Sequence, residues 1–185
     1  MLTVARKLRI EWGDCDPAGI VYFPRYFEYF DISTVGMFEA LGYRKPQLLE
    51  AFDIAGFPVV DVRSSFRIPS KFGDDVVILS SIPEWSRSSF QVHHRLMRGD
   101  ELAVEGFEKR VWVAHDPGRP GGIKAKPLPL ELFERFKVHH RLINGGELAV
   151  EGFETRVWVG HDPSRPGGIR AKPLPPELFK RFRNG

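Results

Sequence analysis

The stretch WGDCDPAGIVYFPRYFEYFD at residues 12–31 joins an acidic turn to an aromatic-rich segment. Pro17 and Gly19 interrupt the turn, and Pro24 suits the first turn of a helix, where its missing N–H leaves no hydrogen bond unmade. We therefore expect a carboxylate beside a helix N-terminus, which carries unpaired N–H groups and a partial positive charge. Because such N–H groups can hold a developing oxyanion, this arrangement favours acyl transfer.

The segment after Pro24 predicts one long helix over residues 24–41, and Gly42 suits its end. Gly36 inside this helix should cost about 1 kcal/mol relative to alanine, and we expect that it permits close approach to a sheet. Apolar side chains recur at three- and four-residue steps and predict one broad buried stripe. The stripe consists of Phe27, Phe30, Thr34, Phe38 and Leu41.

On either side of this helix the sequence predicts strands. Residues 4–12 alternate, which predicts a half-buried strand with Val4, Leu8, Ile10 and Trp12 on its buried face. Further strands are predicted at 58–68, 75–85, 88–97 and 102–115, with turns at Phe72-Gly73-Asp74 and Gly99-Asp100 and a short helix over 127–136. A long helix with a run of antiparallel strands indicates an α+β fold.

The composition indicates a single packed domain rather than a disordered or exported chain. The chain has 185 residues, of which 42% are hydrophobic, and its net charge is +3. No basic block points to nucleic acid, and no long apolar run points to a membrane. Cys15 is a single cysteine, so no intrachain disulfide can form. We expect a cytoplasmic protein that binds neither nucleic acid nor membrane.

The C-terminal part of the chain is a partial tandem repeat. Residues 137–185 repeat 91–136, and the segments 92–136 and 138–182 align without gaps and differ at nine of 45 positions. We expect a domain over 1–136 followed by a duplicated two-strand segment. Either copy has the apolar pattern to fill one place in a sheet, and the shorter connection favours the first. The second copy would then be an added hairpin, an edge extension or a segment exchanged between subunits.

The order of these motifs resembles a known family. GDCDPAGIVYFPRYFEYFD at residues 13–31 is similar to the active-site signature of the hotdog-fold acyl-CoA thioesterases, of the 4-hydroxybenzoyl-CoA thioesterase type. The strand-turn Phe72-Gly73-Asp74, the segment 84–90 and the strand ending near Val111-Trp112-Val113 agree in order. The resemblance covers residues 1–136 almost completely.

This resemblance implies a fold, an activity and a site. The fold is an antiparallel sheet wrapped around one long central helix, in a homodimer or homotetramer with active sites between subunits. The activity is hydrolysis of an acyl-CoA thioester, with an aromatic acyl group such as 4-hydroxybenzoyl or a short one, without metal or redox cofactor. By position in the motif, Asp16 matches the catalytic carboxylate, and Phe23 matches the residue whose backbone N–H polarises the thioester carbonyl.

The carboxylates of the motif have competing roles. Asp14 and Asp16 would share a face of an extended segment, and either could simply cap a helix or satisfy a turn. We assign catalysis to Asp16 and a structural role to Asp14. Asp16 can attack the thioester directly or activate water as a general base; the resemblance favours direct attack, and the residues alone leave both open. Asp31 is expected on a solvated or hydrogen-bonded helix face.

Cysteine and histidine offer weaker alternatives. Cys15 has no identifiable histidine partner, so we expect a small buried side chain rather than a nucleophile. The pairs His93-His94 and His139-His140 cannot chelate as units, because adjacent strand residues point to opposite faces. No metal is therefore expected.

Substrate contacts are predicted from residue type and position. An aromatic wall near Asp16 is formed by Tyr22, Phe23, Tyr26 and Phe27; it suits a flat acyl group and equally suits core packing. Coenzyme A carries phosphates, so basic side chains should line the mouth of the site. Arg87 and Lys71 are the candidates, with Arg63 less certain. Serines flank Arg87 where the family pattern is richer in basic residues, which indicates a looser hold on the nucleotide.

Two other functions fit the same scaffold. A non-catalytic acyl-CoA-binding or assembly module would bind thioesters without turnover, because fold does not fix function. A hotdog hydratase is disfavoured because no histidine lies near the start of the predicted helix.

Overall fold

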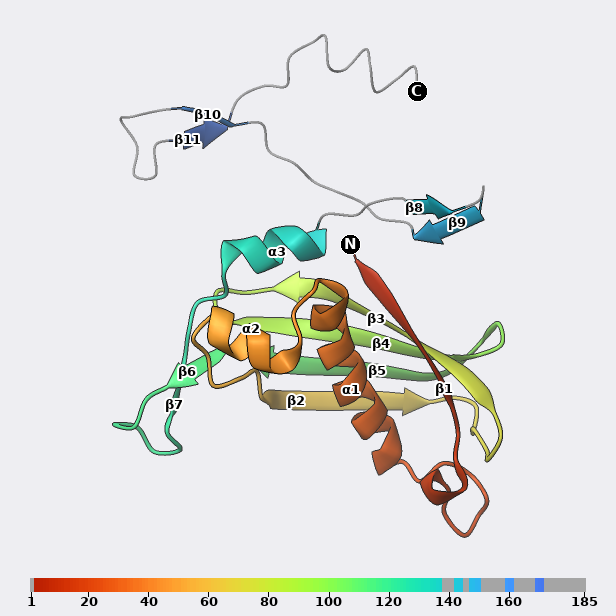
Figure 1. Cartoon of the computed structure of the whole chain (residues 1–185). Helices are drawn as coiled ribbons and strands as arrows, with labels where there is room; N and C mark the ends of the chain where they lie inside the picture. Colours follow the sequence, from red (N-terminus) through yellow and green to blue (C-terminus); the bar gives the residue numbers. More distant parts are fainter. Residues whose placement is uncertain (1, 138–141, 145–146, 151–158, 162–168, 172–185) are drawn as a thin grey trace. The chain divides into compact units, whose positions relative to one another are not determined.

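The computed structural model describes residues 2–137, 142–144, 147–150, 159–161 and 169–171 (Figure 1). Two compact units, Met1–Phe153 and Glu154–Gly185, are described separately. The first unit contains β1 (Thr3–Arg9), the 3-10 turn η1 (Trp12–Asp14), α1 (Pro24–Ala40), α2 (Lys45–Ala51), β2 (Val59–Phe66), β3 (Asp75–Trp85), β4 (Ser89–Arg98), β5 (Glu101–Val111), β6 (Val113–His115), β7 (Ile123–Ala125), α3 (Leu130–Lys137), β8 (Leu142–Asn144) and β9 (Glu147–Val150). The second contains β10 (Val159–His161) and β11 (Ile169–Ala171).

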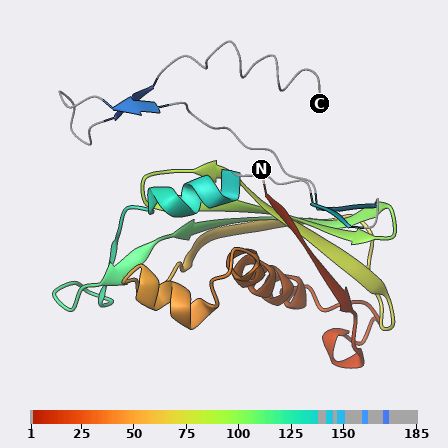
Figure 2. The same ribbon diagram turned by 45° about the horizontal axis from the view of Figure 1, so that its top comes forward.

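The centre of the first unit is an antiparallel sheet in the order β1-β3-β4-β5-β2. Helix α1 lies across one face of this sheet, and the strands bend around it (Figure 2). Pro24 is the first residue of α1, and Gly42, at φ +90°, follows its last turn in the left-handed conformation that glycine tolerates. The predicted hotdog architecture, one long helix wrapped by an antiparallel sheet, is confirmed.

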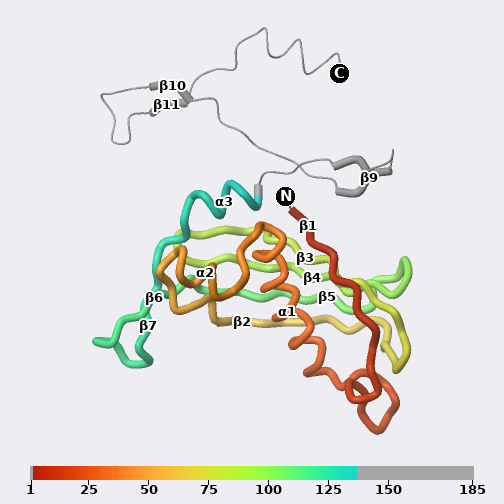
Figure 3. Tube along the Cα trace, viewed as in Figure 1, coloured from red at the N-terminus to blue at the C-terminus, as the bar shows by residue number. Residues whose placement is uncertain are grey.

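Two hydrophobic clusters hold the helix on the sheet. One surrounds Phe30 and Tyr26 and includes Ile10, Val21 and Val104. The other surrounds Phe38 and Trp112, where α2 and α3 cover the end of α1 (Figure 3). The ring of Phe38 lies 5.3 Å from that of Phe136 and 6.2 Å from that of Trp112. The N-terminal half of α1, which starts beside the acidic loop, is therefore positioned by a separate part of the core.

Three details differ from the sequence predictions. Trp12 is 77% exposed, because β1 ends at Arg9 and the chain turns into η1 before Trp12 can reach the buried face. No helix or strand was predicted between Gly42 and residue 58, where the structure has α2. The strand predicted over 102–115 is divided into β5 and β6, which pairs with β7 in a separate two-stranded sheet.

Gly36 is not the close-contact glycine of the fold. A Cβ atom built on Gly36 meets nothing within 4 Å, so the prediction for this residue is wrong. The close approach occurs at Gly106 in β5, where a Cβ would lie 2.8 Å from Cδ2 and 2.9 Å from Cζ of Phe30. The Phe30 ring is fully buried and stacks on His94 at 4.6 Å, so it has no room to move away. Helix and sheet approach each other through a strand glycine.

The first copy of the repeat supplies β5 and most of β4 in the sheet. This agrees with the placement that the shorter connection favoured. In the second copy the described residues form the hairpins β8–β9 and β10–β11. Most of the predicted repeat segment 137–185 lies outside the described residues, so its domain boundary stays a prediction.

A buried polar network lies between α1 and the sheet. Glu108 Oε2 accepts hydrogen bonds from Thr34 Oγ1 (2.9 Å) and from Arg110 Nε (2.8 Å), and it lies 3.4 Å from His94 Nε2. Arg110 Nη2 also donates to Asp31 Oδ1 at 2.7 Å, while His94 Nδ1 lies 2.8 Å from Ser80 Oγ. The network thus connects α1 with β3, β4 and β5 and satisfies charges that would otherwise be costly to bury.

The network should make folding stability depend on pH. Burial lowers the pKa of His94 below its ordinary value. Burial by itself would raise the pKa of Glu108, but the bond to His94 and the charge of Arg110 together lower it. Both groups bind protons more readily in the unfolded chain, so stability should fall as the pH drops below about 6.5, the ordinary histidine value, and again below about 4.5. Each of these two groups changes the free energy of unfolding by up to about 1.4 kcal/mol per pH unit.

Urea unfolding between pH 8 and pH 5 measures this slope. His94→Gln, made together with its repeat counterpart His140→Gln, should flatten it, because the buried titrating ring is gone. His115→Gln with its repeat counterpart His161→Gln is the matched control, because His115 is exposed at the end of β6 and lies outside the network. Equal slopes in the parent chain and the His94 variant would contradict the prediction.

Candidate functional site

The loop that carries Asp16 is closed by backbone pairing between Cys15 and Val21. The Asp16 N–H donates to Ile20 O at 2.9 Å, and Asp16 Oδ1 accepts from the Ala18 N–H at 2.8 Å. The second contact is an Asx-type turn, a structural role that short acidic side chains often take. No described residue bonds Asp16 Oδ2. The half-buried carboxylate is therefore oriented through one oxygen and has the other available.

The start of α1 presents an unused backbone donor. The Val21 N–H donates to Ser70 O at 2.9 Å, and the Tyr22 N–H donates to Asp14 O at 2.8 Å. The next donor, the Phe23 N–H, has no hydrogen-bond partner among the described residues. Phe23 is the residue that precedes α1 and already has helical dihedral angles, φ −51° and ψ −33°. Its N–H therefore lies at the positive end of the helix dipole, where it can hold an oxyanion.

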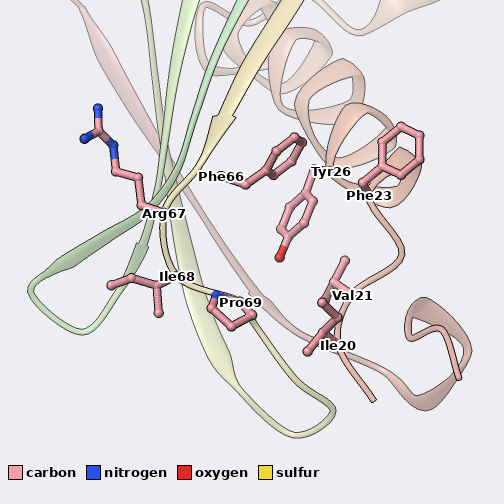
Figure 4. Close-up of a pocket in the computed structure, with 8 residues that line it drawn as sticks. All are labelled: Ile20, Val21, Phe23, Tyr26, Phe66, Arg67, Ile68 and Pro69. Carbon is pink, nitrogen blue, oxygen red and sulfur yellow. The ribbon is translucent and has the colours of Figure 1, made fainter. Parts of the chain in front are cut away.

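A cavity of about 180 Å³ lies beside this donor (Figure 4). Phe23, Tyr26 and Phe66 are among the residues that line it, and Figure 4 shows the guanidinium of Arg67 pointing away from it. Arg67 instead contacts Glu105 at 2.9 Å. The wall is thus predominantly apolar. The complete lining is Ile20, Val21, Phe23, Tyr26, Phe66, Arg67, Ile68 and Pro69.

Asp16 does not line this cavity, although Ile20 and Val21 of its loop do. The structure places Asp16 and Phe23 on one short segment, with the Asx turn and the Cys15–Val21 pairing fixing the path between them. Tyr26 is buried and lines the cavity, whereas Tyr22 is 51% exposed with its ring 5.5 Å from that of Phe23. Of the predicted aromatic wall, Phe23 and Tyr26 thus line the cavity, Tyr22 faces solvent, and Phe27 is not part of the lining.

Asp14 contacts the backbone at the start of the acidic loop and also lies near the first turn of α1. Its Oδ2 accepts from the Glu11 N–H at 2.9 Å, and its Oδ1 lies 3.8 Å from Arg25 Nε. Burial, followed by the nearby Asp14 carboxylate, raises the pKa of Tyr29 above its ordinary value. Asp14 therefore has the structural surroundings predicted for it, and it differs from Asp16 in having partners at both oxygens.

The predicted basic residues do not join the cavity within one chain. Lys71 is exposed in the connection between β2 and β3. Arg87 lies in the turn after β3, at the far end of an 11-residue strand from the acidic loop, a separation of roughly 35 Å. Arg87 lines a different cavity of about 370 Å³, with Trp85, Ser86, Pro127, Leu128, Leu130 and Phe133. Arg63 stacks over Phe107, outside the cavity near Asp16, with its guanidinium 4.9 Å from the ring.

Sequence reasoning missed Phe66 and Pro69 as cavity residues. Both follow or end β2, whose partner is β5, 38 residues further along the chain at the Phe66↔Val104 pair. Because that register is set by long-range pairing, no local signal in the sequence could have found these two residues. Within the described residues, no cluster of histidine, cysteine, aspartate and glutamate could hold a metal ion, and no helix there is long and apolar enough to cross a membrane.

Comparison with known proteins gives the relatives of this chain. The 4-hydroxybenzoyl-CoA thioesterase of Pseudomonas sp. (strain CBS-3) is 33% identical over 138 residues, 71% of this chain and 96% of the relative. The 1,4-dihydroxy-2-naphthoyl-CoA hydrolase of Synechococcus sp. (strain WH7803) is 23% identical over 128 residues, 66% of this chain and 82% of the relative.

Solved structures agree with these relatives. A mutant 4-hydroxybenzoyl-CoA thioesterase in complex with 4-hydroxybenzoyl-CoA superposes with a TM-score of 0.67 at 30% identity, covering 72% of this chain and 98% of its own. A gentisyl-coenzyme A thioesterase superposes with a TM-score of 0.62 at 30% identity, covering 70% and 99%. The model of the thioesterase-like superfamily matches residues 10–182. The chain therefore belongs to the thioesterase-like superfamily, and its predicted resemblance to the hotdog-fold acyl-CoA thioesterases of the 4-hydroxybenzoyl-CoA type is confirmed.

Proposed function

We propose that this protein hydrolyses an aromatic acyl-CoA thioester to the free acid and coenzyme A. The observation that carries the proposal is the unpartnered Phe23 N–H at the start of α1, on the same short segment as the Asp16 carboxylate. The apolar cavity between Phe23, Tyr26 and Phe66 suits a flat ring. The names of three relatives specify aromatic acyl groups: 4-hydroxybenzoyl, dihydroxynaphthoyl and gentisyl.

The chemistry assigned to these groups is acyl transfer through a tetrahedral intermediate. Asp16 attacks the thioester carbon, and the oxygen that gains negative charge accepts a hydrogen bond from the Phe23 N–H, a contact typically worth about 3–4 kcal/mol of barrier. The carbon–sulfur bond then breaks, coenzyme A leaves as the thiolate, and a mixed anhydride remains. Water hydrolyses the anhydride and restores the carboxylate. Asp16 acting as a general base on water is the alternative.

One solved relative supports the choice of an aspartate. It is a variant in which a single aspartate is replaced by asparagine, and it holds 4-hydroxybenzoyl-CoA. Of the two aspartates in the acidic loop, Asp16 is the one with an oxygen available for such work, because Asp14 has partners at both oxygens.

We further propose that the active protein is a homodimer or homotetramer. Strand β2 pairs with β5 on one side and forms an edge of the sheet, and large apolar side chains are exposed along it. These are Val59, Val60, Val62 and Phe66, each at least 40% exposed. An exposed apolar edge strand is a template for pairing with another chain.

Steady-state release of thiol from benzoyl-, 4-hydroxybenzoyl-, hexanoyl- and acetyl-CoA tests the activity. The aromatic thioesters should have kcat/KM at least about tenfold above acetyl-CoA, since burying a ring in an apolar cavity is worth more than 1.4 kcal/mol. Binding of all four without thiol release would contradict hydrolysis and indicate the acyl-CoA-binding module instead.

A further inference from the structure

The two copies of the repeat share the residues that, in the first copy, fill the core. In the first copy the nine positions at which they differ lie at the surface or are half-buried, with one exception, Ala114, which is 8% exposed. The residues that fill the core recur unchanged 46 positions later. His94, Gly106, Glu108 and Arg110, for example, correspond to His140, Gly152, Glu154 and Arg156. The second copy therefore contains every buried contact group of the first except one methyl group.

The described hairpins of the second copy also reproduce the backbone pairing of the first. Strands β8 and β9 pair Leu142 with Val150 and Ile143 with Leu148, with a register shift between the two pairs. The equivalent part of β4 and β5 pairs Leu96 with Val104 and Met97 with Leu102, with the same shift. Strands β10 and β11 likewise repeat the register of β6 and β7 at all three pairs.

The residue that precedes the first copy, Phe90, also has a counterpart that packs in the core. Phe90, which packs against Phe38 at 5.9 Å, has Phe136 as its counterpart 46 positions later. Phe136, which fills the core at the end of α3, has Phe182 as its own counterpart. The family match extends through residue 182, so it does not stop at the end of the first copy.

We propose that the place in the sheet between β3 and β2 has two alternative occupants within one chain, residues 92–136 and residues 138–182. The first copy occupies it in the present structure. In the alternative form the second copy pairs with β3 and β2, lies under α1, and leaves the first copy as a long insertion after Trp85. The proposal concerns folding and is independent of the catalytic activity.

Loop closure sets the balance between the two forms. With the first copy in the sheet, residues 86–88 connect β3 to β4. With the second copy, residues 86–134 make the same connection. The entropic cost of closing a loop rises with its length, and this difference favours the form with the short connection by about 60-fold in population. The form with the second copy in the sheet is thus minor in the parent chain. It should become the major form when a substitution disfavours the first copy in the sheet by more than that factor.

Gly106 and Gly152 allow each copy to be damaged separately in the full chain. Gly106→Val should be excluded from the place under Phe30, since a Cβ there would lie within 3 Å of a fully buried ring, while valine suits a strand elsewhere. This variant should remain folded by circular dichroism and cooperative melting, because the second copy replaces the first. Gly152→Val should match the parent, and the double variant should be unfolded. A double variant as stable as Gly106→Val would contradict the proposal.

Crosslinking identifies the occupant directly. Leu79 of β3 pairs with Arg95, whose counterpart is Arg141. In a Cys15→Ser background, Leu79→Cys with Arg95→Cys should be joined by a short bifunctional maleimide in the parent sequence. Leu79→Cys with Arg141→Cys should be joined, within a monomer, when Gly106→Val is present. The proposal is overturned if this second pair fails to react, or if it joins two chains into a covalent dimer.

Discussion

Replacing Asp16 with asparagine should lower kcat for a 4-hydroxybenzoyl-CoA substrate by about 10²–10⁴-fold, the range that a positioned acid–base group supplies. Asparagine can neither attack the thioester carbon nor accept a proton from water. Its side-chain oxygen can still accept the Ala18 N–H bond, so the loop geometry and the melting temperature should stay close to those of the parent. Steady-state thiol release at saturating substrate measures kcat, and thermal unfolding measures the melting temperature.

Asp14→Asn is the matched control, two residues away in the same loop. The Asp14–Arg25 pair is long, at 3.8 Å, and partly exposed, so its loss should cost no more than about 1 kcal/mol. Turnover should therefore fall by less than about tenfold. The assignment of catalysis to Asp16 fails if its variant retains the parent kcat, or if Asp14→Asn loses as much activity.

Local sequence signals predicted most of the architecture. Pro24 and Gly42 mark the ends of the long helix within a residue, because a proline in the first turn and a left-handed glycine after the last are properties of the local backbone. The strand predicted over 75–85 has the observed bounds of β3. Alternation of apolar residues is set by which face of a strand is buried, and this requires no knowledge of the partner strand.

Features that depend on contacts between distant segments were not predictable. A lone helical glycine suggested a close approach at Gly36, whereas the contact belongs to Gly106 and requires the register of β5 under Phe30. The buried network of His94, Glu108 and Arg110 was also missed, since β4 supplies the histidine, β5 supplies the other two residues, and they meet α1 only in the folded chain. Nothing in a strand sequence distinguishes such charges from solvated ones.

The sequence predicted the loop residues of the candidate site, but it did not predict the residues of β2 that line the cavity. Asp16 and Phe23 follow from one contiguous motif, and the structure places both on the segment between Cys15 and α1. Phe66 comes from an edge strand whose position depends on pairing with β5. The role of Arg87 stays a prediction, because the structure places this residue beyond the opposite end of β3, where it lines a different cavity.

Removing the guanidinium of Arg110 should destabilise the form in which the first copy lies in the sheet. Its side chain is 4% exposed and donates to Glu108, which is 2% exposed, and to Asp31. Arg110→Met leaves the Glu108 carboxylate buried without its cationic partner, a change that typically costs about 3–5 kcal/mol. Asp31→Asn is the control, because its carboxylate is 54% exposed at the edge of the network and should contribute no more than about 1 kcal/mol.

The repeat changes how this loss appears in the full chain. Arg156 is the counterpart of Arg110, so in the single variant the second copy can take the place of the first. The loss should then be limited to the free energy of the longer loop, about 2.4 kcal/mol for a factor of 60. Arg110→Met with Arg156→Met removes this alternative and should show the full 3–5 kcal/mol. Urea unfolding of both variants measures the difference in their free energies of unfolding. Equal losses in the single and double variants would mean that the second copy does not take the place of the first. A loss below about 1 kcal/mol in the double variant would mean that the buried charge pair does not stabilise the fold.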